Sequence, residues 1–192
     1  MTENEKRMRH EWHDANYDEE ILKMREKTNI LCEKINAVSQ YDPERNELLK
    51  QVLEVSELPE GLEILSPVYM DLGGENIRFG KNDFFNHGTY FMDNGRITFG
   101  DHVFVGPYCG FYTSTHPMDY VSRNKGLEKA LAITVGDNCW FGANVSVMPG
   151  VHIGNGCVIA AGSVVTHDLP DNSMAAGVPA EVKKTIDQNS HI

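Results

Sequence analysis

A histidine followed by a proline, His116-Pro117, offers the clearest chemistry in this chain. It lies near the start of a polar loop at 112–132, and the proline restricts the backbone directly after the histidine. Because an imidazole titrates near neutral pH, a histidine that is exposed and held in place meets the requirements of a general base. We therefore take His116 as the candidate base, to be weighed against the ordinary case of a surface histidine.

Four widely spaced cysteines carry the other reactive groups, and no two of them form a Cys-x-x-Cys pair. A cysteine-based zinc site is therefore not expected. Three of them share one position of a sequence repeat, the position of small core residues, so the sequence predicts structural thiols and no metal site. The four are Cys32, Cys109, Cys139 and Cys157.

The composition is that of one folded domain, or of one domain with an accessory element. The chain has 192 residues, with 17 basic and 28 acidic side chains for a net charge of −11. Such a chain is a poor match for nucleic acid or an anionic membrane surface. The charged start, MTENEKRMRH, lacks the apolar core of a secretion signal, and no run of 18 apolar residues is present to span a membrane. Together with unpaired thiols, these features favour a cytoplasmic protein.

Residues 1–60 differ from the rest of the chain, because none of the 17 glycines lies among them. Apolar residues recur there at the spacing of one helix face. The pair Asp42-Pro43 predicts a helix start, with an N-cap followed by a first-turn proline. We expect three short helices in 1–60, lying against a domain at 61–184 that is followed by a tail at 185–192. The first helix face comprises Ile21, Met24, Thr28, Leu31, Cys32 and Ile35.

A six-residue repeat fills the second half of the chain and is interrupted by the loop 112–132. Each unit reads [LIVF]-G-x-x-[VCS]-x. A helix needs a period near 3.6 and a plain sheet a period of two, so this period predicts short strands joined at sharp corners. Three units close one coil of a hexapeptide β-helix with the apolar residue inside, and we expect the glycine to allow a backbone geometry that other residues resist. The apolar positions are Phe99, Val105, Phe111, Val135, Phe141, Val147, Ile153, Ile159 and Val165.

Motifs around this repeat resemble those of the hexapeptide-repeat O-acetyltransferases, most closely the maltose and galactoside acetyltransferases. They are TSTHPMD in the loop, NCWFG in the coils, AAGVP near the C-terminus and WHDANYDEE in the helical segment. The resemblance implies a mainly β fold, a left-handed parallel β-helix with a small N-terminal α-helical segment. It also implies that His116 is the catalytic base, which takes the proton of a sugar hydroxyl as that hydroxyl attacks acetyl-CoA directly.

The same resemblance assigns residues to the acceptor side of the site. Asn86, in FFNHG, matches an asparagine that contacts the acceptor and borders the cofactor. Asn94 matches a position, commonly aspartate, that lines the acceptor pocket. Asp14 and Asp71 match two further acceptor-side positions, although an extra residue around Gly73-Gly74 blurs the alignment there.

For acetyl-CoA, the resemblance implies contacts along successive coils. A backbone N–H near Ala143 is the expected donor to the oxyanion, and Trp140 matches an aromatic residue near the active-site loop. Ala161 and Thr166 match positions that accept the pantetheine arm, and Lys184 matches one that meets the phosphates.

Glu181 departs from the family pattern, because an arginine is common at its position. This difference puts one phosphate contact in doubt and predicts weaker binding of CoA. The family works as trimers with active sites between subunits, so the resemblance implies a homotrimer whose partners are acetyl-CoA and a small sugar.

Three other interpretations remain open from the sequence. The γ-class carbonic anhydrases share the β-helix and bind zinc through three histidines, but the histidine spacing here does not match theirs. A non-catalytic binding protein built on the same repeat would need neither His116 nor Asn86. An acetyltransferase for another hydroxylated acceptor, such as an antibiotic, differs only in its acceptor, and the segment 1–60 favours a sugar. The sequence names neither the sugar nor the hydroxyl.

Overall fold

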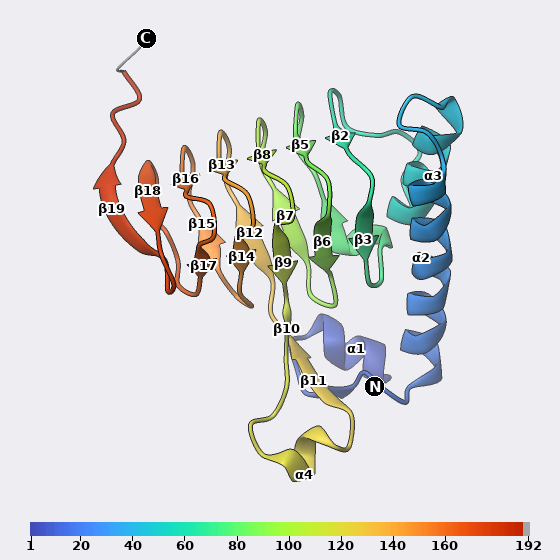
Figure 1. The fold of residues 1–192 in the computed structure, drawn as a ribbon. Coiled ribbons are helices and arrows are strands. Elements are labelled where there is room, and N and C mark those ends of the chain that lie inside the picture. The colour runs from blue at the N-terminus through green and yellow to red at the C-terminus, as the bar shows by residue number, and fades with distance from the viewer. Residues whose placement is uncertain (190–192) are drawn as a thin grey trace.

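The structure is a computed structural model that describes residues 1–189. Its main body is a parallel β-helix in which successive strands enter three sheets in turn (Figure 1). The predicted mainly β fold class is therefore confirmed. The predicted tail begins within the last strand, and its residues 190–192 lie outside the described part of the chain.

We number the three sheets I, II and III in the order in which each full coil passes through them, beginning with the coil that starts at β4. Sheet I contains β4 (Ile77–Arg78), β7 (Ile97–Phe99), β12 (Ile133–Val135) and β15 (His152–Ile153). Sheet II contains β2 (Glu63–Ile64), β5 (Phe84–Phe85), β8 (Phe104–Val105), β13 (Trp140–Phe141), β16 (Val158–Ile159), β18 (Ser173–Ala176) and β19 (Glu181–Thr185). Sheet III contains β3 (Val68–Met70), β6 (Thr89–Met92), β9 (Gly110–Tyr112), β14 (Ser146–Val147) and β17 (Val164–Val165). All neighbours pair in parallel except β18 and β19, which are antiparallel.

The interior of the β-helix is filled by the repeat. Each predicted apolar position from Phe99 to Val165 is at most 3% exposed, and the small-residue position is buried as well. All four cysteine thiols are free and buried, as predicted for structural residues. Phe85 and Phe91 fill the coils that precede Phe99 in the same way, and both are fully buried.

The glycine that follows the apolar residue is required because the coils pack closely there. The sequence-based expectation, that it allows an unusual backbone conformation, was wrong. A Cβ atom on Gly142 would lie 2.5 Å from the backbone nitrogen of Ala161 in the next coil. Positive φ angles occur instead three residues after the apolar position, at Tyr108, Asn144 and Gly162. The coils therefore stack so closely that a side chain at the glycine position would collide with the neighbouring backbone.

Two helices cover the first coil of the β-helix (Figure 1). They are α2 (Glu19–Ala37), longer than expected, and α3 (Pro43–Leu53), which Asp42 caps through the backbone N–H of Glu44 at 2.9 Å. Asn36 exchanges two hydrogen bonds of 2.9 Å with the backbone of Val68 on edge strand β3. The helical segment thus satisfies the polar groups of an open sheet edge. Within residues 1–189, no helix is long and apolar enough to cross a membrane.

The predicted loop 112–132 forms an arm that projects from the body (Figure 1). It contains β10 (Ser114–Thr115), the short helix α4 (Tyr120–Arg123) and β11 (Leu127–Ala130). Strand β1 (His13–Asp14) pairs with β11 in an antiparallel manner and completes a small sheet in the order β1-β11-β10. Helix α1 (Glu3–Met8) leads into β1, so the start of the chain lies against the arm.

Candidate active site

His116 follows β10, where the arm leaves the body of the β-helix. Its Nδ1 lies 2.9 Å from the carbonyl oxygen of Leu127 on β11. Because a carbonyl oxygen only accepts hydrogen bonds, Nδ1 carries the proton and Nε2 of the neutral ring keeps its lone pair. The side chain is 42% exposed, so a substrate hydroxyl has access to Nε2. These are the properties that a general base needs.

A buried carboxylate faces the same nitrogen. Glu128, on β11, is 5% exposed, and its Oε2 lies 3.8 Å from His116 Nε2. Its other oxygen, Oε1, lies 3.6 Å from Nε2 of His13 on β1. A negative charge at this place stabilises the imidazolium that forms when His116 accepts a proton.

Asp71 and Asn94 form a polar pair at the corner between sheets III and I. Asn94 Nδ2 donates a hydrogen bond of 2.9 Å to one carboxylate oxygen of Asp71, and Tyr90 donates one of 2.7 Å to the other. Burial raises the pKa of Asp71, while the bonds from Tyr90 and Asn94 oppose the rise. The charge of Glu128 also raises it, which places this pair within electrostatic range of the arm. The Oδ1 atom of Asn94 is buried without a hydrogen-bond partner among residues 1–189.

Asp14 lies on β1, where the register sets it opposite Leu127. Its Oδ1 accepts hydrogen bonds from the backbone N–H groups of Asn16 at 3.1 Å and Tyr17 at 2.9 Å. Since Leu127 also supplies the carbonyl that orients His116, the structure brings Asp14 into the surroundings of the base. Asp14 therefore lies beside the strand that orients His116, while Asp71 and Asn94 lie at the corner between sheets III and I from which the arm leaves.

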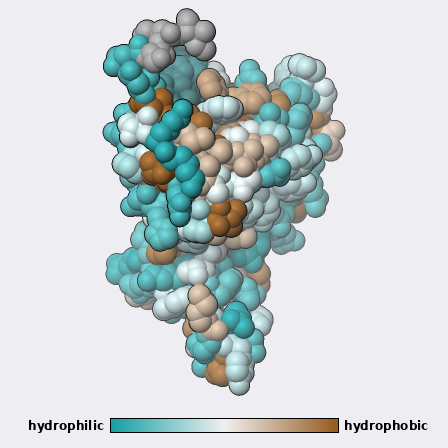
Figure 2. Space-filling model, turned by 60° about the vertical axis from the view of Figure 1, so that its left-hand side comes forward, coloured by the Kyte–Doolittle hydropathy of each residue, from teal (hydrophilic) through white to brown (hydrophobic). Residues whose placement is uncertain are grey.

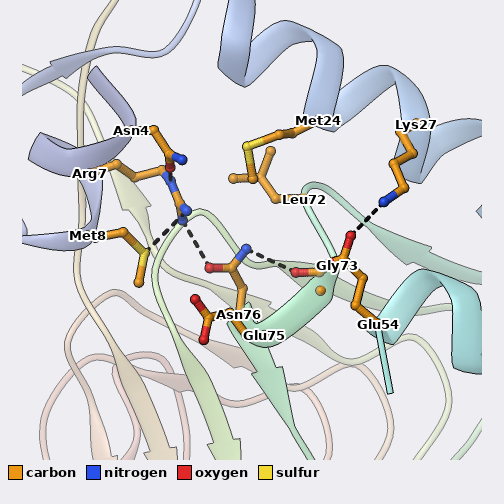
Figure 3. A pocket seen from close by; sticks show the side chains of 11 residues that line it. Asn4, Arg7, Met8, Met24, Lys27, Glu54, Leu72, Gly73, Glu75 and Asn76 are labelled. Atoms are coloured by element: carbon orange, nitrogen blue, oxygen red, sulfur yellow. Dashed lines mark hydrogen bonds and ion pairs between the residues drawn. The ribbon is translucent and has the colours of Figure 1, made fainter. Parts of the chain in front are cut away.

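Helix α1 holds the turn that carries Asn94. Arg7 is only 3% exposed, and its Nη1 donates to Asn76 Oδ1 at 3.1 Å and to the carbonyl oxygen of Asn94. Figure 3 shows Arg7 and Asn76 in a pocket of about 190 Å³ between α1, α2 and the short helix η1 (Gly74–Asn76). The lysine in this pocket, Lys27, is already paired with Glu54 at 2.5 Å. Arg7 thus has a supporting role, which no sequence motif indicated.

The predicted CoA-side residues lie mostly at another corner. Asn86, Ala143 and Ala161 follow strands of sheet II and precede strands of sheet III. Ala143 accepts a hydrogen bond of 2.8 Å from Gly162 N–H, so this corner forms a continuous column along the coils. Trp140 points outward from β13 and is 56% exposed. Within one chain, sheet III separates this column from His116.

Two predicted CoA residues lie apart from that column. Thr166 follows β17 at the corner between sheets III and I, where its hydroxyl contacts His167 Nδ1 at 2.8 Å. Lys184 is exposed on β19, opposite Met174 of β18. Glu181, the departure from the family pattern, forms an ion pair of 3.0 Å with Lys183 on the same strand. Lys183, the basic residue next to Lys184, is therefore already paired with a carboxylate.

Among residues 1–189, no group of three or more histidine, cysteine or acidic side chains is arranged to hold a metal ion. The arm instead holds residues that sequence reasoning missed, chiefly Glu128 and His13. In the strand Leu127–Ala130 burial alternates, and Glu128 takes a buried position. A carboxylate at an inward position of a short strand is a signal that could have singled out Glu128.

Family models match two segments of the chain. Residues 6–55 match the maltose acetyltransferase hexapeptide capping motif, and residues 132–167 match the hexapeptide repeat of succinyl-transferase. The first covers most of the helical segment, and the second covers coils that follow the arm.

Relatives match the chain over almost its whole length. A protein of Staphylococcus aureus named as an acetyltransferase is 45% identical over 190 residues, covering 98% of this chain and 94% of the relative. A maltose O-acetyltransferase from Clostridium difficile is 36% identical, with a TM-score of 0.88 over 98% of this chain and 99% of that one. A galactoside acetyltransferase in complex with coenzyme A is 31% identical, with a TM-score of 0.90 over 98% and 93%. The chain is therefore an acetyltransferase that belongs to the maltose and galactoside O-acetyltransferase family of hexapeptide-repeat proteins.

Proposed function

We propose that the protein transfers the acetyl group of acetyl-CoA to a hydroxyl of a sugar of the maltose, glucose or galactoside type. The observation that carries the proposal is the placement of His116, a partly exposed side chain whose Nδ1 lies 2.9 Å from the Leu127 carbonyl oxygen and whose Nε2, among residues 1–189, makes no hydrogen bond closer than its 3.8 Å approach to Glu128. The maltose and galactoside activities of the two structural relatives support a sugar as acceptor. Asp14, Asp71 and Asn94 supply polar groups for its hydroxyls.

The reaction needs no covalent enzyme intermediate. Nε2 of His116 takes the proton of the sugar hydroxyl as its oxygen attacks the thioester carbonyl of acetyl-CoA. The negative oxygen of the tetrahedral intermediate is stabilised by a backbone N–H, which we assign to Ala143. The carbon–sulfur bond then breaks, and the proton on His116 passes to the leaving thiolate to give the acetylated sugar and CoA. While His116 is protonated, Glu128 stabilises its charge across 3.8 Å.

We propose a homotrimer, because one chain does not bring the base and the CoA residues together. Asn86, Ala143 and Ala161 lie where the chain enters sheet III, and His116 lies where it leaves. A second copy with its sheet II facing sheet III of the first brings both groups into one site. Trp140 at 56% and Phe104 at 50% exposure, register partners on sheet II, offer an apolar surface for this contact.

Sheet III presents a matching surface. Tyr90 stacks on Tyr69 and on Tyr112, with ring centroids 5.9 Å and 6.1 Å apart. Figure 2 shows pale and brown residues gathered over the middle of the β-helix body, above the projecting arm. An outward-facing aromatic row on each of two adjacent sheets, exposed on sheet II and partly exposed on sheet III, is typical of a surface that another chain covers. The four free thiols fit a reducing compartment, so we place the trimer in the cytoplasm.

The test is release of free thiol from acetyl-CoA with maltose, glucose and galactosides as acceptors and chloramphenicol as a non-sugar control. A sugar should stimulate release, and His116→Ala should lower kcat by on the order of a hundredfold or more while the KM for acetyl-CoA stays within about twofold. If only chloramphenicol stimulates release, the acceptor is wrong. If His116→Ala keeps the full rate, His116 is not the base.

A further inference from the structure

His13 faces the site from the N-terminal segment. It is fully buried on β1, and the strand register sets it directly opposite Glu128. Its Nε2 lies 3.6 Å from Glu128 Oε1, and neither atom makes a hydrogen bond among the described residues. Because the other oxygen of Glu128 lies 3.8 Å from His116 Nε2, one buried carboxylate faces two histidines.

Both ring nitrogens of His13 face groups that accept hydrogen bonds. Nδ1 lies 3.2 Å from the carbonyl oxygen of Glu11, a group that only accepts, so this contact is favourable when Nδ1 carries a proton. Nε2 faces a carboxylate oxygen, so the second contact is favourable when Nε2 also carries a proton.

We propose that His13 is a positioning residue that tunes the base through Glu128, an inference that rests on the proposed function of His116. His13 shares the negative charge of Glu128 and so limits the pull of that carboxylate on a protonated His116. A base must be unprotonated to accept the proton of the hydroxyl. His13 therefore keeps more of His116 in its reactive neutral form at a given pH, and it couples the N-terminal segment to the chemistry in the arm.

Of the other charged groups around the arm, Glu3 has a pKa that its hydrogen bond to Lys6 lowers, with a smaller contribution from His13, and Arg7 has a pKa that burial lowers and Glu128 raises. The hydrogen bonds of Glu3 and Arg7 are nevertheless made to other groups. Glu3 of α1 pairs with Lys6 at 2.5 Å and accepts the backbone N–H of Asp14. Arg7 is bonded to Asn76, Asp71 is bonded to Tyr90 and Asn94, and Nδ1 of His10 faces the carbonyl oxygen of Ala130. Lys129 follows Glu128 on β11, where burial alternates, so its side chain lies on the opposite face of the strand from that of Glu128. Glu128 is thus the group that His13 and His116 share.

The experiment is the pH dependence of kcat/KM for acetyl transfer in the full-length protein. His13→Phe keeps an aromatic ring and removes both ring nitrogens that face the acceptors, so the acidic limb of the profile should move to higher pH by about 0.5 unit or more. His13→Gln keeps a hydrogen-bonding group without charge and should shift the limb in the same direction. Glu128→Gln should shift it the opposite way, to lower pH. The KM for acetyl-CoA should stay within about twofold in the His13 variants.

A double-variant cycle separates this role from a structural one. In the Glu128→Gln background, His13→Phe should no longer move the limb, because the carboxylate through which it acts is gone. His10→Gln is the matched control. His10 lies in the same segment between α1 and β1, but its ring contacts the carbonyl oxygen of Ala130, so this change should leave the acidic limb of the pH profile in place. Should His13→Phe fail to fold, His13→Gln alone and with Glu128→Gln carries the same comparison.

Two results overturn the inference. One is a wild-type pH profile in folded His13 variants, and the other is a shift from His13→Phe that persists when Glu128 is glutamine. If His116→Ala is inactive while the His13 variants match wild type, this inference alone fails. If His116→Ala keeps the wild-type rate, the proposed function itself fails.

Discussion

The amide of Asn94 is an important hydrogen-bond donor to the buried carboxylate of Asp71. Asn94 is 1% exposed, and its amide supplies one of the two hydrogen bonds that oppose the burial of the Asp71 carboxylate. The family commonly has an aspartate at the position of Asn94, yet here a carboxylate would face another carboxylate. The amide is therefore the partner that this particular Asp71 requires.

Replacing Asn94 by aspartate should destabilise the protein in a pH-dependent way. Two carboxylates would meet where Nδ2 and Oδ2 now lie 2.9 Å apart, and one of them must keep a proton. We expect the free energy of unfolding to fall by about 1–3 kcal/mol at pH 8 and by less toward pH 5. The reason is that the carboxyl with the raised pKa is protonated at low pH, where the pair is tolerated, and must lose its proton as the pH rises. Thermal unfolding at both values measures it.

The matched control for that change is the exchange Asp71→Asn with Asn94→Asp, which again sets one amide against one carboxylate. It should recover most of the stability lost at pH 8. A deficit that is equal at both pH values would show that charge is not its cause.

At the level of elements, the β-helix depends on how closely its coils approach. The predicted repeat is present, but the glycine is needed because the next coil lies where its side chain would be. The backbone adopts its left-handed conformation elsewhere in the corner, often at asparagine. Glycines at the close-packed position and glycines at the left-handed position should therefore respond differently to substitution.

Gly142→Ala should cost far more than Gly162→Ala. The first introduces a Cβ atom 2.5 Å from the backbone nitrogen of Ala161, for which we expect a loss near the upper end of overpacking, about 3 kcal/mol. The second has no atom within 4 Å and pays only the strain of a φ of +73°, about 1 kcal/mol. Urea unfolding of both variants measures the difference. Equal losses of stability in the two variants would mean that backbone conformation, not packing, explains the regular spacing of glycine in the repeat.

At the level of the whole molecule, the site is divided between two edges of sheet III. The proposed acceptor-side residues Asp14, Asp71 and Asn94 lie on the side of the arm, whereas Asn86, which is expected to contact the acceptor as well as the cofactor, lies with Ala143 and Ala161 at the opposite corner. Sheets II and III both carry aromatic side chains on their outer faces. Assembly of copies around an axis would cover these faces and complete the site at the same time.

Phe104→Glu should therefore disrupt assembly and activity together. Phe104 is half exposed in one chain, so the fold should tolerate the change, but a charge in a covered apolar surface should weaken association at least about thirtyfold. Sedimentation velocity should show three copies for the native protein and a smaller species for the variant. Tyr41→Glu, on a side chain that is 94% exposed near the helices, is the control and should remain trimeric. A monomeric native protein would contradict the proposal.

Much of the fold could be predicted from the sequence, because its determinants are local. The period of six from Phe99 to Val165 reflects one inward side chain for each side of the coil, and the spacing from Ile21 to Ile35 reflects one helix face. The loop that carries His116 was visible as a break in that period. Resemblance to a known family then supplied an expected role for each site residue.

The electrostatic surroundings of His116 could not be predicted in this way. Glu128 and His13 are more than a hundred residues apart in the chain, and neither the repeat nor the motif that contains His13 indicates that the two side chains meet. Only the antiparallel register of β1 and β11 sets them opposite each other and beside the base. The separation of the CoA column from His116 likewise follows from how the coils stack. Local periodicity specifies which element forms, whereas long-range register and stacking specify which charges meet.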